Sequence, residues 1–537
     1  MNNTDLTDRV PRDAEPSKEI GFSCPERYNA SAVLFDNLER GHGDRPAVLC
    51  SAGDFTYAEL CAHAARIGNA LIAEGLERGD RVLCFLDDHG DYLAAIFGAI
   101  RAGFVPMLIN TQSTDDLIGF YLEDSDAKIV LCETHARARF GPAVVEGTAV
   151  RRVVTAGPGA EGPESLAAFI EGQPDSLAPA DTHRDEMAFW MYSSGSTGRP
   201  KGVVHLQHDM PYTAEAYAKP ILGLGHDDIC FSVPKIFFAY GFGNSATFPF
   251  SVGGASLLMP EAPKPDRIFE LVRERRPTRF FGLPTLYTAL VRHESAAGAD
   301  FSSVATCISA AEILSEEIFE AWKSRFGHEI LEGLGSTEVL HIYLSNRIEG
   351  KNLGSAGQRV PGYAIALTDA AGRPVARGEE GIMWVLGDSN APCYWNRPDK
   401  TAETMRDGWI YTGDRFTEDA DGFFFFKGRA DDLVKVSGQW VYPLEVELML
   451  ANHPGVHECA VLAVDLPDRR TTLKAFVVPA NGTEPGAVTT KDLQRFAKEK
   501  LVPYKYPRIV EYMESLPKTG TGKIDRAQLK ARPVEDA

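Results

Sequence analysis

The chain has 537 residues, of which 44% are hydrophobic and 24% charged, and its formal net charge is -20. A single hydrophobic core stops growing near ~250–300 residues, so this length predicts two or more domains. The acidic balance disfavours nonspecific binding to nucleic acid or to anionic membranes, whose phosphates would be repelled. No stretch approaches ~18 uncharged apolar residues and the first residues lack a signal-peptide pattern, so we expect neither a membrane span nor export.

The nine cysteines are isolated, odd in number and never spaced as CxxC. This spacing fits neither a disulfide framework nor a structural zinc site, and it favours a reducing compartment. We therefore expect a cytoplasmic protein. Its assembly is left open between a monomer and a homodimer.

The first part of the chain alternates helices with short strands. Thr56 and Glu59 form the pattern of a capping box, and the apolar residues that follow repeat with helical spacing as far as Gly75. This alternation of strands with helices predicts parallel sheets that are covered by helices. The further elements expected here are strands at 81–86 and 104–109, a helix at 92–101, and strands near 231, 255–259, 279–281 and 306–308.

Beyond about residue 365 the pattern changes to shorter strands separated by turns, and it ends in an aromatic strand at 423–426. A compact set of elements then follows: a strand at 433–436, a helix at 444–451, strands at 459–464 and 474–478, and a helix at 490–501. We predict an α/β protein with a large N-terminal domain over 1–430, made of two parallel-rich αβ sheet subdomains and a small β lobe. A small, mobile α+β domain is expected over 431–537.

A glycine-rich segment at 193–202 is the first candidate site. Its glycines expose backbone amides, and its hydroxyl groups and Lys201 add donors and a positive charge, which suits a polyphosphate. The apolar segment 187–192 is expected as a strand that delivers this loop to a sheet edge. The alternative is a flexible linker, although linkers rarely end in Arg-Pro-Lys-Gly directly after a buried strand. The candidate phosphate-binding residues are Ser193, Ser194, Gly195, Ser196, Thr197, Gly198 and Lys201.

Other nucleotide-binding motifs fit less well. A Walker loop requires serine or threonine after its lysine, but Gly202 follows Lys201. A G-x-G-x-x-G pattern at 157–162 contains Pro158, and no acidic residue closes a strand about 20 residues later, as dinucleotide binding requires. We interpret this pattern, and a weaker one at 241–246, as chance.

Four separated motifs, taken together, resemble the acyl-adenylate-forming superfamily of acyl-CoA synthetases, luciferases and adenylation domains. In chain order they are 193–202, 335–338, 411–414 with 428–432, and 517–524. They span most of the chain in the order found in that family. The resemblance implies that ATP activates a carboxylic acid as an acyl-adenylate, with Mg²⁺, and that coenzyme A then displaces AMP.

The resemblance also implies roles for single residues. Thr337 offers a hydroxyl to the α-phosphate, and Glu338 offers a hard carboxylate to Mg²⁺. Asp414 and Arg429 contact the ribose or a phosphate. Lys523 is catalytic with Thr337 and Glu338, because a cation that bridges two anions stabilises the transition state. The remaining implied AMP contacts are Ala311, Glu312, Gly333, Gly335 and Ser336.

For the second half-reaction, the resemblance implies a rotation of the C-terminal domain about Asp431. The rotation would bring a coenzyme A channel formed by Lys435, Ser437 and Gly438 toward the acyl group.

Two segments, 234–244 and 331–346, resemble the benzoate-CoA ligase branch of the superfamily. An aromatic acid needs a slot between an aromatic wall and small residues. His341 is either a core histidine bonded to a carbonyl or a donor to the substrate, and Leu334 stands where many relatives carry an aromatic residue. The candidate aryl-pocket residues are Phe238, Ala239, Tyr240, Gly241, Leu334, His341 and Ile342.

Benzoate is the first choice of substrate, and a hydroxybenzoate or an aminobenzoate comes next. Three other functions stay open. The first is an adenylating enzyme that loads another acid or a carrier-protein thiol, the second is a nucleotide-binding regulator without catalysis, and the most distant is a dehydrogenase that uses the 157–162 pattern.

Overall fold

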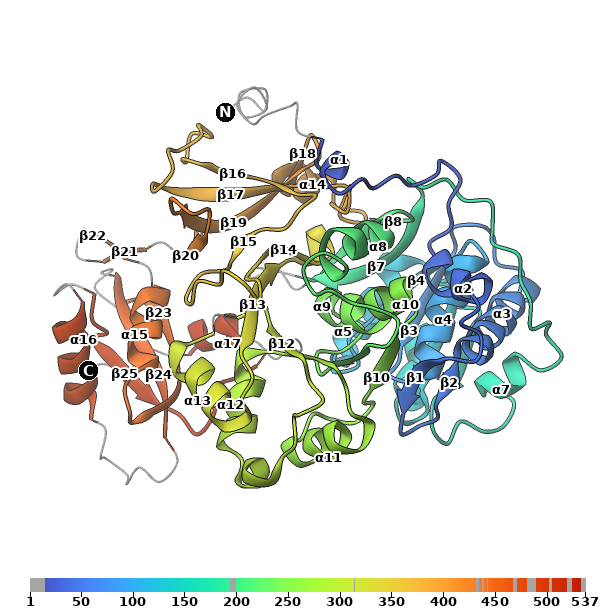
Figure 1. Cartoon of the computed structure of the whole chain (residues 1–537), viewed down its shortest axis with the longest axis horizontal. Coiled ribbons are helices and arrows are strands. Elements are labelled where there is room, and N and C mark those ends of the chain that lie inside the picture. The colour runs from blue at the N-terminus through green and yellow to red at the C-terminus, as the bar shows by residue number, and fades with distance from the viewer. Residues whose placement is uncertain are drawn as a thin grey trace.

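The computed structural model describes residues 15–193, 199–312, 314–430, 434–436, 439–441, 443–466, 471–480, 489–501, 505–518 and 524–532. Figure 1 shows two large sheets with helices around them, a smaller antiparallel sheet at the top, and the C-terminal elements in red at the left. This arrangement confirms the predicted α/β class with parallel-rich sheets.

The first sheet has six strands in the order β6-β5-β3-β4-β7-β8. All neighbours are parallel except β7 and β8, which form an antiparallel hairpin. The strands are β3 (Arg81–Phe85), β4 (Val105–Leu108), β5 (Ile129–Glu133), β6 (Arg152–Ala156), β7 (Met187–Ser193) and β8 (Lys201–Leu206). The strand predicted at 187–192 is confirmed as β7, and the two ends of the glycine-rich segment, Ser193 and Lys201, lie on this hairpin at the edge of the sheet.

Helices α3 (Tyr57–Ala73), α4 (Gly90–Arg101) and α5 (Asp115–Ser125) belong to this half of the molecule. The predicted capping box is present, because the Thr56 hydroxyl accepts the Glu59 amide while the Glu59 carboxylate accepts the Thr56 amide. The helix stops before Gly75, whose φ of 74° lies in the left-handed region.

The second sheet has nine strands in the order β15-β14-β13-β12-β11-β9-β10-β1-β2. Its six central strands are parallel, and β14, β15 and β2 are antiparallel to their neighbours. The strands are β1 (Pro46–Cys50), β2 (Phe55–Thr56), β9 (Ile229–Ser232), β10 (Ala255–Leu258), β11 (Arg279–Gly282), β12 (Thr306–Ser309), β13 (Ile330–Gly335), β14 (Ile342–Ser345) and β15 (Gln358–Arg359).

Helices α11 (Pro265–Arg275), α12 (Pro284–Arg292) and α13 (Glu316–Phe326) pack beside the second sheet, around a core that contains Trp322 and Tyr287. The small β lobe is an antiparallel sheet of β16 (Ala364–Thr368), β17 (Glu380–Leu386), β18 (Met405–Arg406), β19 (Trp409–Glu418) and β20 (Phe424–Arg429). The helix α14 (Pro398–Thr404) precedes β18.

The C-terminal elements form a separate small core. They are β21 (Val434–Val436), β22 (Gln439–Val441), α15 (Pro443–Ala451), β23 (Val456–Asp465), β24 (Thr471–Pro479), α16 (Thr490–Lys500), β25 (Ile509–Tyr512) and α17 (Arg526–Lys530). The boundary between residues 430 and 431 stays a prediction, because 431–433 are outside the described residues.

All nine cysteines fall in the described part and none forms a disulfide. Among the described helices, none is long and apolar enough to cross a membrane. The two G-x-G-x-x-G patterns lack a strand-turn-helix context: 157–162 follows β6 in an irregular loop, and 241–246 lies inside a helical segment.

Candidate active site

The β7–β8 hairpin places Ser193 and Lys201 opposite each other in register. The Lys201 ammonium lies 4.1 Å from the centre of the Tyr394 ring, and burial lowers the pKa of Lys201 while the nearby Glu338 carboxylate opposes that shift. A lysine is therefore held at the base of the predicted phosphate loop. Five of the predicted loop residues, Ser194, Gly195, Ser196, Thr197 and Gly198, lie outside the described residues.

Glu338 lies in the short 3-10 turn η6 (Thr337–Val339), and its carboxylate faces the hairpin. Its Oε1 accepts hydrogen bonds from the Tyr394 hydroxyl at 2.8 Å and from Ser193 Oγ at 3.5 Å. Burial, together with this carboxylate, raises the pKa of Tyr394. The phenol therefore stays protonated and acts as the hydrogen-bond donor to Glu338. Two predicted motifs 145 residues apart thus meet at one carboxylate.

The backbone leaves η6 through a strained residue. Leu340 has φ 70° and ψ -39°, a conformation that non-glycine residues rarely adopt, and its side chain is buried. The turn reverses the chain between β13 and β14, so that Thr337 and His341 lie at its two ends. Gly335 is required here, because a Cβ at this position would lie 2.5 Å from the His341 carbonyl oxygen.

Asp414 and Arg429 are paired across β19 and β20. Arg429 Nη1 donates to Asp414 Oδ1 at 3.0 Å and to the Thr412 carbonyl at 3.0 Å. Gly413 between them has φ 72°, and a Cβ there would lie 3.0 Å from Arg429 Nη2. The glycine thus lets the guanidinium pack flat against the strand and orient the Asp414 carboxylate.

The predicted AMP contacts Ala311 and Glu312 follow β12. Ala311 has φ 71°, and Glu312 Oε2 accepts the Thr285 amide at 3.4 Å. The hydroxyls of Ser309 and Ser336 are buried and have no hydrogen-bond partner among the described residues. Buried hydroxyls without partners are uncommon, so both are available to a ligand. At Gly333 a Cβ would lie 2.9 Å from the Ile342 side chain, which shows why this position is a glycine.

The aryl segment is a continuous helical run of α9 (Ala239–Phe242), the π turn η4 (Gly243–Thr247) and α10 (Phe248–Val252). A second π turn, η3 (Ala214–Ala218), extends α8 (Asp209–Thr213) and carries Tyr217. π turns are rare and are often found at functional sites.

His341 lies among three aromatic rings: its ring centre is 4.4 Å from that of Phe248 and 5.6 Å from those of Tyr217 and Tyr240. Its Nε2 donates to the Tyr240 carbonyl at 3.3 Å, while its Nδ1 is buried without a partner among the described residues. Burial lowers the pKa of His341 to about 3, so the ring is neutral and Nδ1 is an acceptor. The carbonyl bond is the first of the two alternatives considered for His341.

The predicted pocket residues belong to two packing clusters. Ala239 and Phe238 pack with the core of the first sheet, whereas Tyr240, Leu334 and Ile342 pack with the core between the second sheet and the β lobe. Gly241 does not leave space for a ligand, because a Cβ there would lie 2.0 Å from the Lys235 carbonyl oxygen. Its missing side chain admits the backbone of Pro234 and Lys235 instead.

Several predicted residues cannot be placed. Asp431, Ser437, Gly438 and Lys523 lie outside the described residues, and so does the side chain of Lys435 in β21. Their assigned roles stay predictions.

Sequence reasoning missed Tyr394 and His205. Tyr394 lies in a loop with no motif to mark it. His205 was detectable, because residues 201, 203 and 205 of a strand share one face. The position of Lys201 on β8 therefore predicts that His205 lies on the same face of the strand. In the structure, His205 Nε2 lies 2.9 Å from the Thr337 carbonyl oxygen.

The β7–β8 hairpin and the Thr337–Glu338 turn, which meet through Ser193 and Glu338, are the arrangement expected of a nucleotide-dependent enzyme. The model of the AMP-binding enzyme family matches residues 35–395, and that of the AMP-binding enzyme C-terminal domain matches 445–523. The chain belongs to this family, which confirms the resemblance to acyl-adenylate-forming enzymes.

Within the family, the chain is similar to ligases of aromatic acids. It is 41% identical over 513 residues to the benzoate–CoA ligase of Thauera aromatica, covering 95% of this chain and 97% of that protein. A solved benzoate CoA ligase from Burkholderia xenovorans has a TM-score of 0.86 and 38% identity, covering 94% and 100% of the two chains. The anthranilate CoA ligase AuaEII, solved in complex with anthranoyl-AMP, has a TM-score of 0.89 and 33% identity, covering 95% and 98%.

Proposed function

We propose that this protein ligates an aromatic carboxylic acid to coenzyme A in two steps through an enzyme-bound acyl-AMP. The observation that carries the proposal is the convergence of Ser193, Lys201 and Glu338 beside a turn whose other end, at His341, packs among three aromatic rings. Nucleotide and aromatic acid are thereby brought to the two ends of one five-residue segment, as the transfer of an adenylyl group requires.

In the first step a carboxylate oxygen of the acid attacks the α-phosphorus of ATP. A new oxygen–phosphorus bond forms, the bond to the β-phosphate oxygen breaks, and diphosphate leaves. Lys201 and the loop that begins at Ser193 bind the leaving phosphates, and the Thr337 hydroxyl contacts the α-phosphate. Asp414, oriented by Arg429, accepts the ribose hydroxyls.

The residues present also fit Mg²⁺. Glu338 supplies a hard carboxylate oxygen, and this ion usually binds one or two carboxylates together with substrate phosphates. When bound, Mg²⁺ neutralises charge on the phosphates. Lys523 bridges the two reacting anions, so that its positive charge stabilises the transition state more than the ground state.

In the second step the sulfur of coenzyme A attacks the acyl carbonyl carbon, a thioester forms and AMP leaves. Lys523 must vacate the channel for the pantetheine arm. We expect the C-terminal domain to rotate about Asp431 and to bring Lys435, Ser437 and Gly438 toward the thiol.

The aromatic pocket favours an uncharged ring. His341 is neutral and gives its only proton to the Tyr240 carbonyl, so it cannot neutralise a second negative group. His341 Nδ1 can accept a hydrogen bond from a hydroxyl or amino group on the substrate ring. With benzoate, Nδ1 would face the unsubstituted edge of the ring. Benzoate remains the first choice, and hydroxybenzoates and aminobenzoates follow.

A substrate panel tests the reaction and the acid together. The protein is incubated with ATP, Mg²⁺, coenzyme A and benzoate, its 2-amino or its 2-, 3- or 4-hydroxy derivative, or a short fatty acid. We expect AMP, diphosphate and an aryl-CoA, with kcat/KM highest for benzoate. Aryl-AMP that accumulates in the presence of coenzyme A would instead support an adenylating enzyme that loads another thiol. An inactive but ATP-binding protein would support a regulator.

The two steps are separated by the variant Lys523→Ala. Adenylate formation should fall by about 100-fold or more, because an electrostatic contact made in the transition state is lost. Thioester formation from supplied benzoyl-AMP should persist. An equal loss in both half-reactions would contradict the two-conformation mechanism.

A further inference from the structure

The backbone of the Thr337–Glu338 turn is held by three donors from outside the turn. The Val339 carbonyl accepts Ser389 Oγ at 2.9 Å, and the Glu338 carbonyl accepts the Ala391 amide at 2.8 Å. The Thr337 carbonyl accepts His205 Nε2 at 2.9 Å and also the Leu340 amide at 3.1 Å. Three successive carbonyls of η6 are thus fixed, two by neutral donors and one by a histidine.

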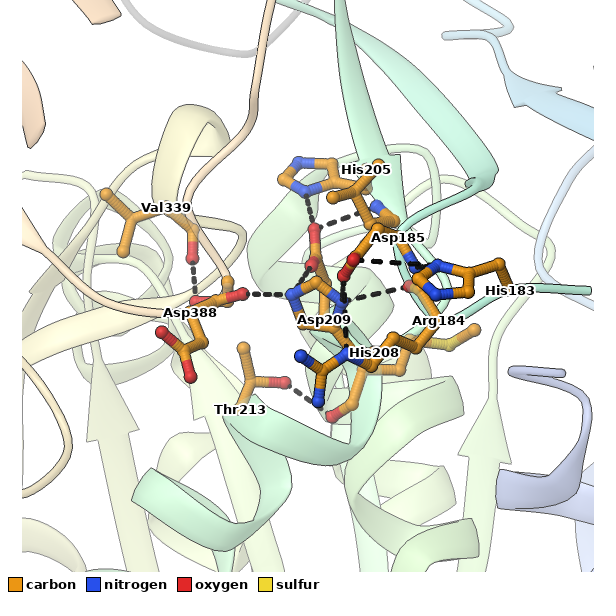
Figure 2. A network of polar contacts seen from close by, with 12 residues as sticks. His183, Arg184, Asp185, His205, His208, Asp209, Thr213, Val339 and Asp388 are labelled. Atoms are coloured by element: carbon orange, nitrogen blue, oxygen red, sulfur yellow. Dashed lines mark hydrogen bonds and ion pairs between the residues drawn. The ribbon is translucent and has the colours of Figure 1, made fainter. Parts of the chain in front are cut away.

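Both ring nitrogens of His205 face acceptor oxygens. Its Nδ1 lies 2.8 Å from Asp209 Oδ2, while its Nε2 faces the Thr337 carbonyl, so both neighbours are acceptors. Asp209 Oδ2 also accepts the Leu206 amide at 3.0 Å. Only the imidazolium form of histidine donates from both nitrogens. A His205 imidazolium paired with the Asp209 carboxylate satisfies both contacts (Figure 2).

This ion pair is completely removed from water. The side chains of His205 and Asp209 have 0% exposure, and the His205 ring stacks on Phe189 with centres 5.3 Å apart. A buried ion pair contributes little to stability compared with apolar residues of the same size. A contribution to folding stability is therefore not enough to explain why His205 and Asp209 occupy these buried positions.

A second histidine borders the pair on its outer side. His208 Nδ1 lies 2.9 Å from the Arg184 carbonyl and its Nε2 lies 2.7 Å from the Asp388 carbonyl (Figure 2). Its Nε2 is also 3.4 Å from Asp209 Oδ1. His208 thereby ties β8 and α8 to residue 388, one position before the serine that holds the Val339 carbonyl.

We propose that His205 and Asp209 are positioning residues for the adenylation step: the buried ion pair fixes the strained turn from which Thr337 and Glu338 reach the nucleotide. The pair touches neither ATP nor the acid and acts through the Thr337 carbonyl. This inference rests on the proposed two-step ligation.

The strain in the turn explains why a charged donor is needed. Leu340, with φ 70°, costs free energy that the surrounding contacts must offset. Its amide shares the Thr337 carbonyl with His205, so both ends of the turn are fixed through one oxygen atom. A charged donor makes a shorter and stronger hydrogen bond than a neutral one. Because β8 also carries Lys201, one strand sets the spacing between that lysine and Glu338.

The test uses the full-length protein and its two half-reactions. In His205→Gln, benzoate-dependent diphosphate release should fall by about 10- to 100-fold, the range expected when a hydrogen bond to a charged group is lost. Thioester formation from supplied benzoyl-AMP should change by less than about threefold, because it needs no contact between Glu338 and diphosphate. Asp209→Asn should act in the same direction, and the double variant should be no worse than His205→Gln, since the pair acts as a unit.

The control is His63→Gln. His63 Nε2 lies 2.8 Å from Asp91 Oδ1, the same length as the bond between His205 and Asp209, but it is remote from the turn. The His63→Gln variant should leave the rates of both half-reactions unchanged. An equal loss in both half-reactions of His205→Gln would indicate a purely structural role and overturn the proposal, as would unchanged adenylation or additive losses in the double variant. Failure of the proposed function is distinguishable, because the unmodified protein would then release no diphosphate with any aromatic acid.

Discussion

At its Thr337 end, the turn over residues 337–341 meets a carboxylate, a lysine and hydroxyl groups, whereas at its His341 end it meets three aromatic rings. The first end holds charged groups close together: Lys201 lies over the Tyr394 ring, and the Tyr394 hydroxyl donates to Glu338. The second end removes charge, since burial lowers the pKa of His341 to about 3. Charged groups thus lie at the end where the proposal places the phosphates, and the end where it places the aromatic ring has none.

The largest expected effect comes from removing the charge at the polar end. Glu338→Gln keeps the size of the side chain but loses the anion, so adenylation should slow by about 100-fold or more. Affinity for benzoate, measured by calorimetry, should stay within about twofold if the two ends are independent. The control Glu418→Gln removes a partly buried carboxylate that pairs with Arg377 on the β lobe and should have no effect. A large loss of benzoate affinity in Glu338→Gln would show that the ends are coupled.

The aromatic end is best disturbed by Gly243→Ala. A Cβ at this position would lie 2.2 Å from His341 Cδ2, so the imidazole must move and lose its bond to the Tyr240 carbonyl. We expect KM for benzoate to rise about tenfold, the usual size of an overpacking effect, with KM for ATP unchanged. Gly298→Ala is the matched control, because nothing lies within 4 Å of its added methyl group. An increase in KM for ATP of equal size would argue against separate ends.

A smaller effect should follow from Tyr394→Phe. This change removes the hydroxyl that donates to Glu338 at 2.8 Å but keeps the ring over Lys201. Loss of one hydrogen bond to a carboxylate should lower the rate of diphosphate release by about tenfold. Tyr92→Phe removes a buried hydroxyl that has no partner among the described residues, and it should leave the rate unchanged.

The smallest effect concerns stability at low pH. The pKa of His341 is about 3 in the fold, against an ordinary value of 6.5, so between these values the unfolded chain binds a proton that the folded chain does not. Stability should therefore rise with pH through this window and fall as the solution is acidified below 6.5. From pH 7.0 to 5.5 the loss due to His341 should be about 1 kcal/mol. Urea denaturation of the protein and of His341→Asn at both pH values measures it, and an equal acid loss in both proteins would assign the effect to other groups.

Much of the fold was predictable, because its elements carry local signals. The capping box at Thr56, the strands around 81–86 and 104–109, and the C-terminal set of strands and helices all appear close to the expected bounds. The meeting of Ser193 with Glu338 followed from the order of the motifs. These features depend on periodicity and on motifs that a linear sequence displays.

The parts that escaped prediction depend on contacts across the fold. Tyr394 was missed because its partner lies 56 residues away. Gly241 was assigned to a pocket, whereas its bare α-carbon admits the backbone of residues 234 and 235, and no sequence pattern distinguishes these two uses of glycine. The positive φ of Leu340 was equally hidden, since leucine gives no warning of a left-handed conformation.

The π turn at Gly243–Thr247 makes the aromatic end depend on residue number as well as residue type. A π turn accommodates one residue more than an α turn, so the segment that follows it keeps the direction it would have after a regular helix one residue shorter. Phe248, whose ring centre is 4.4 Å from that of His341, begins that segment. One residue inserted into α9, with the π turn unchanged, would rotate Phe248 by about 100° about the helix axis and present a different side chain to His341.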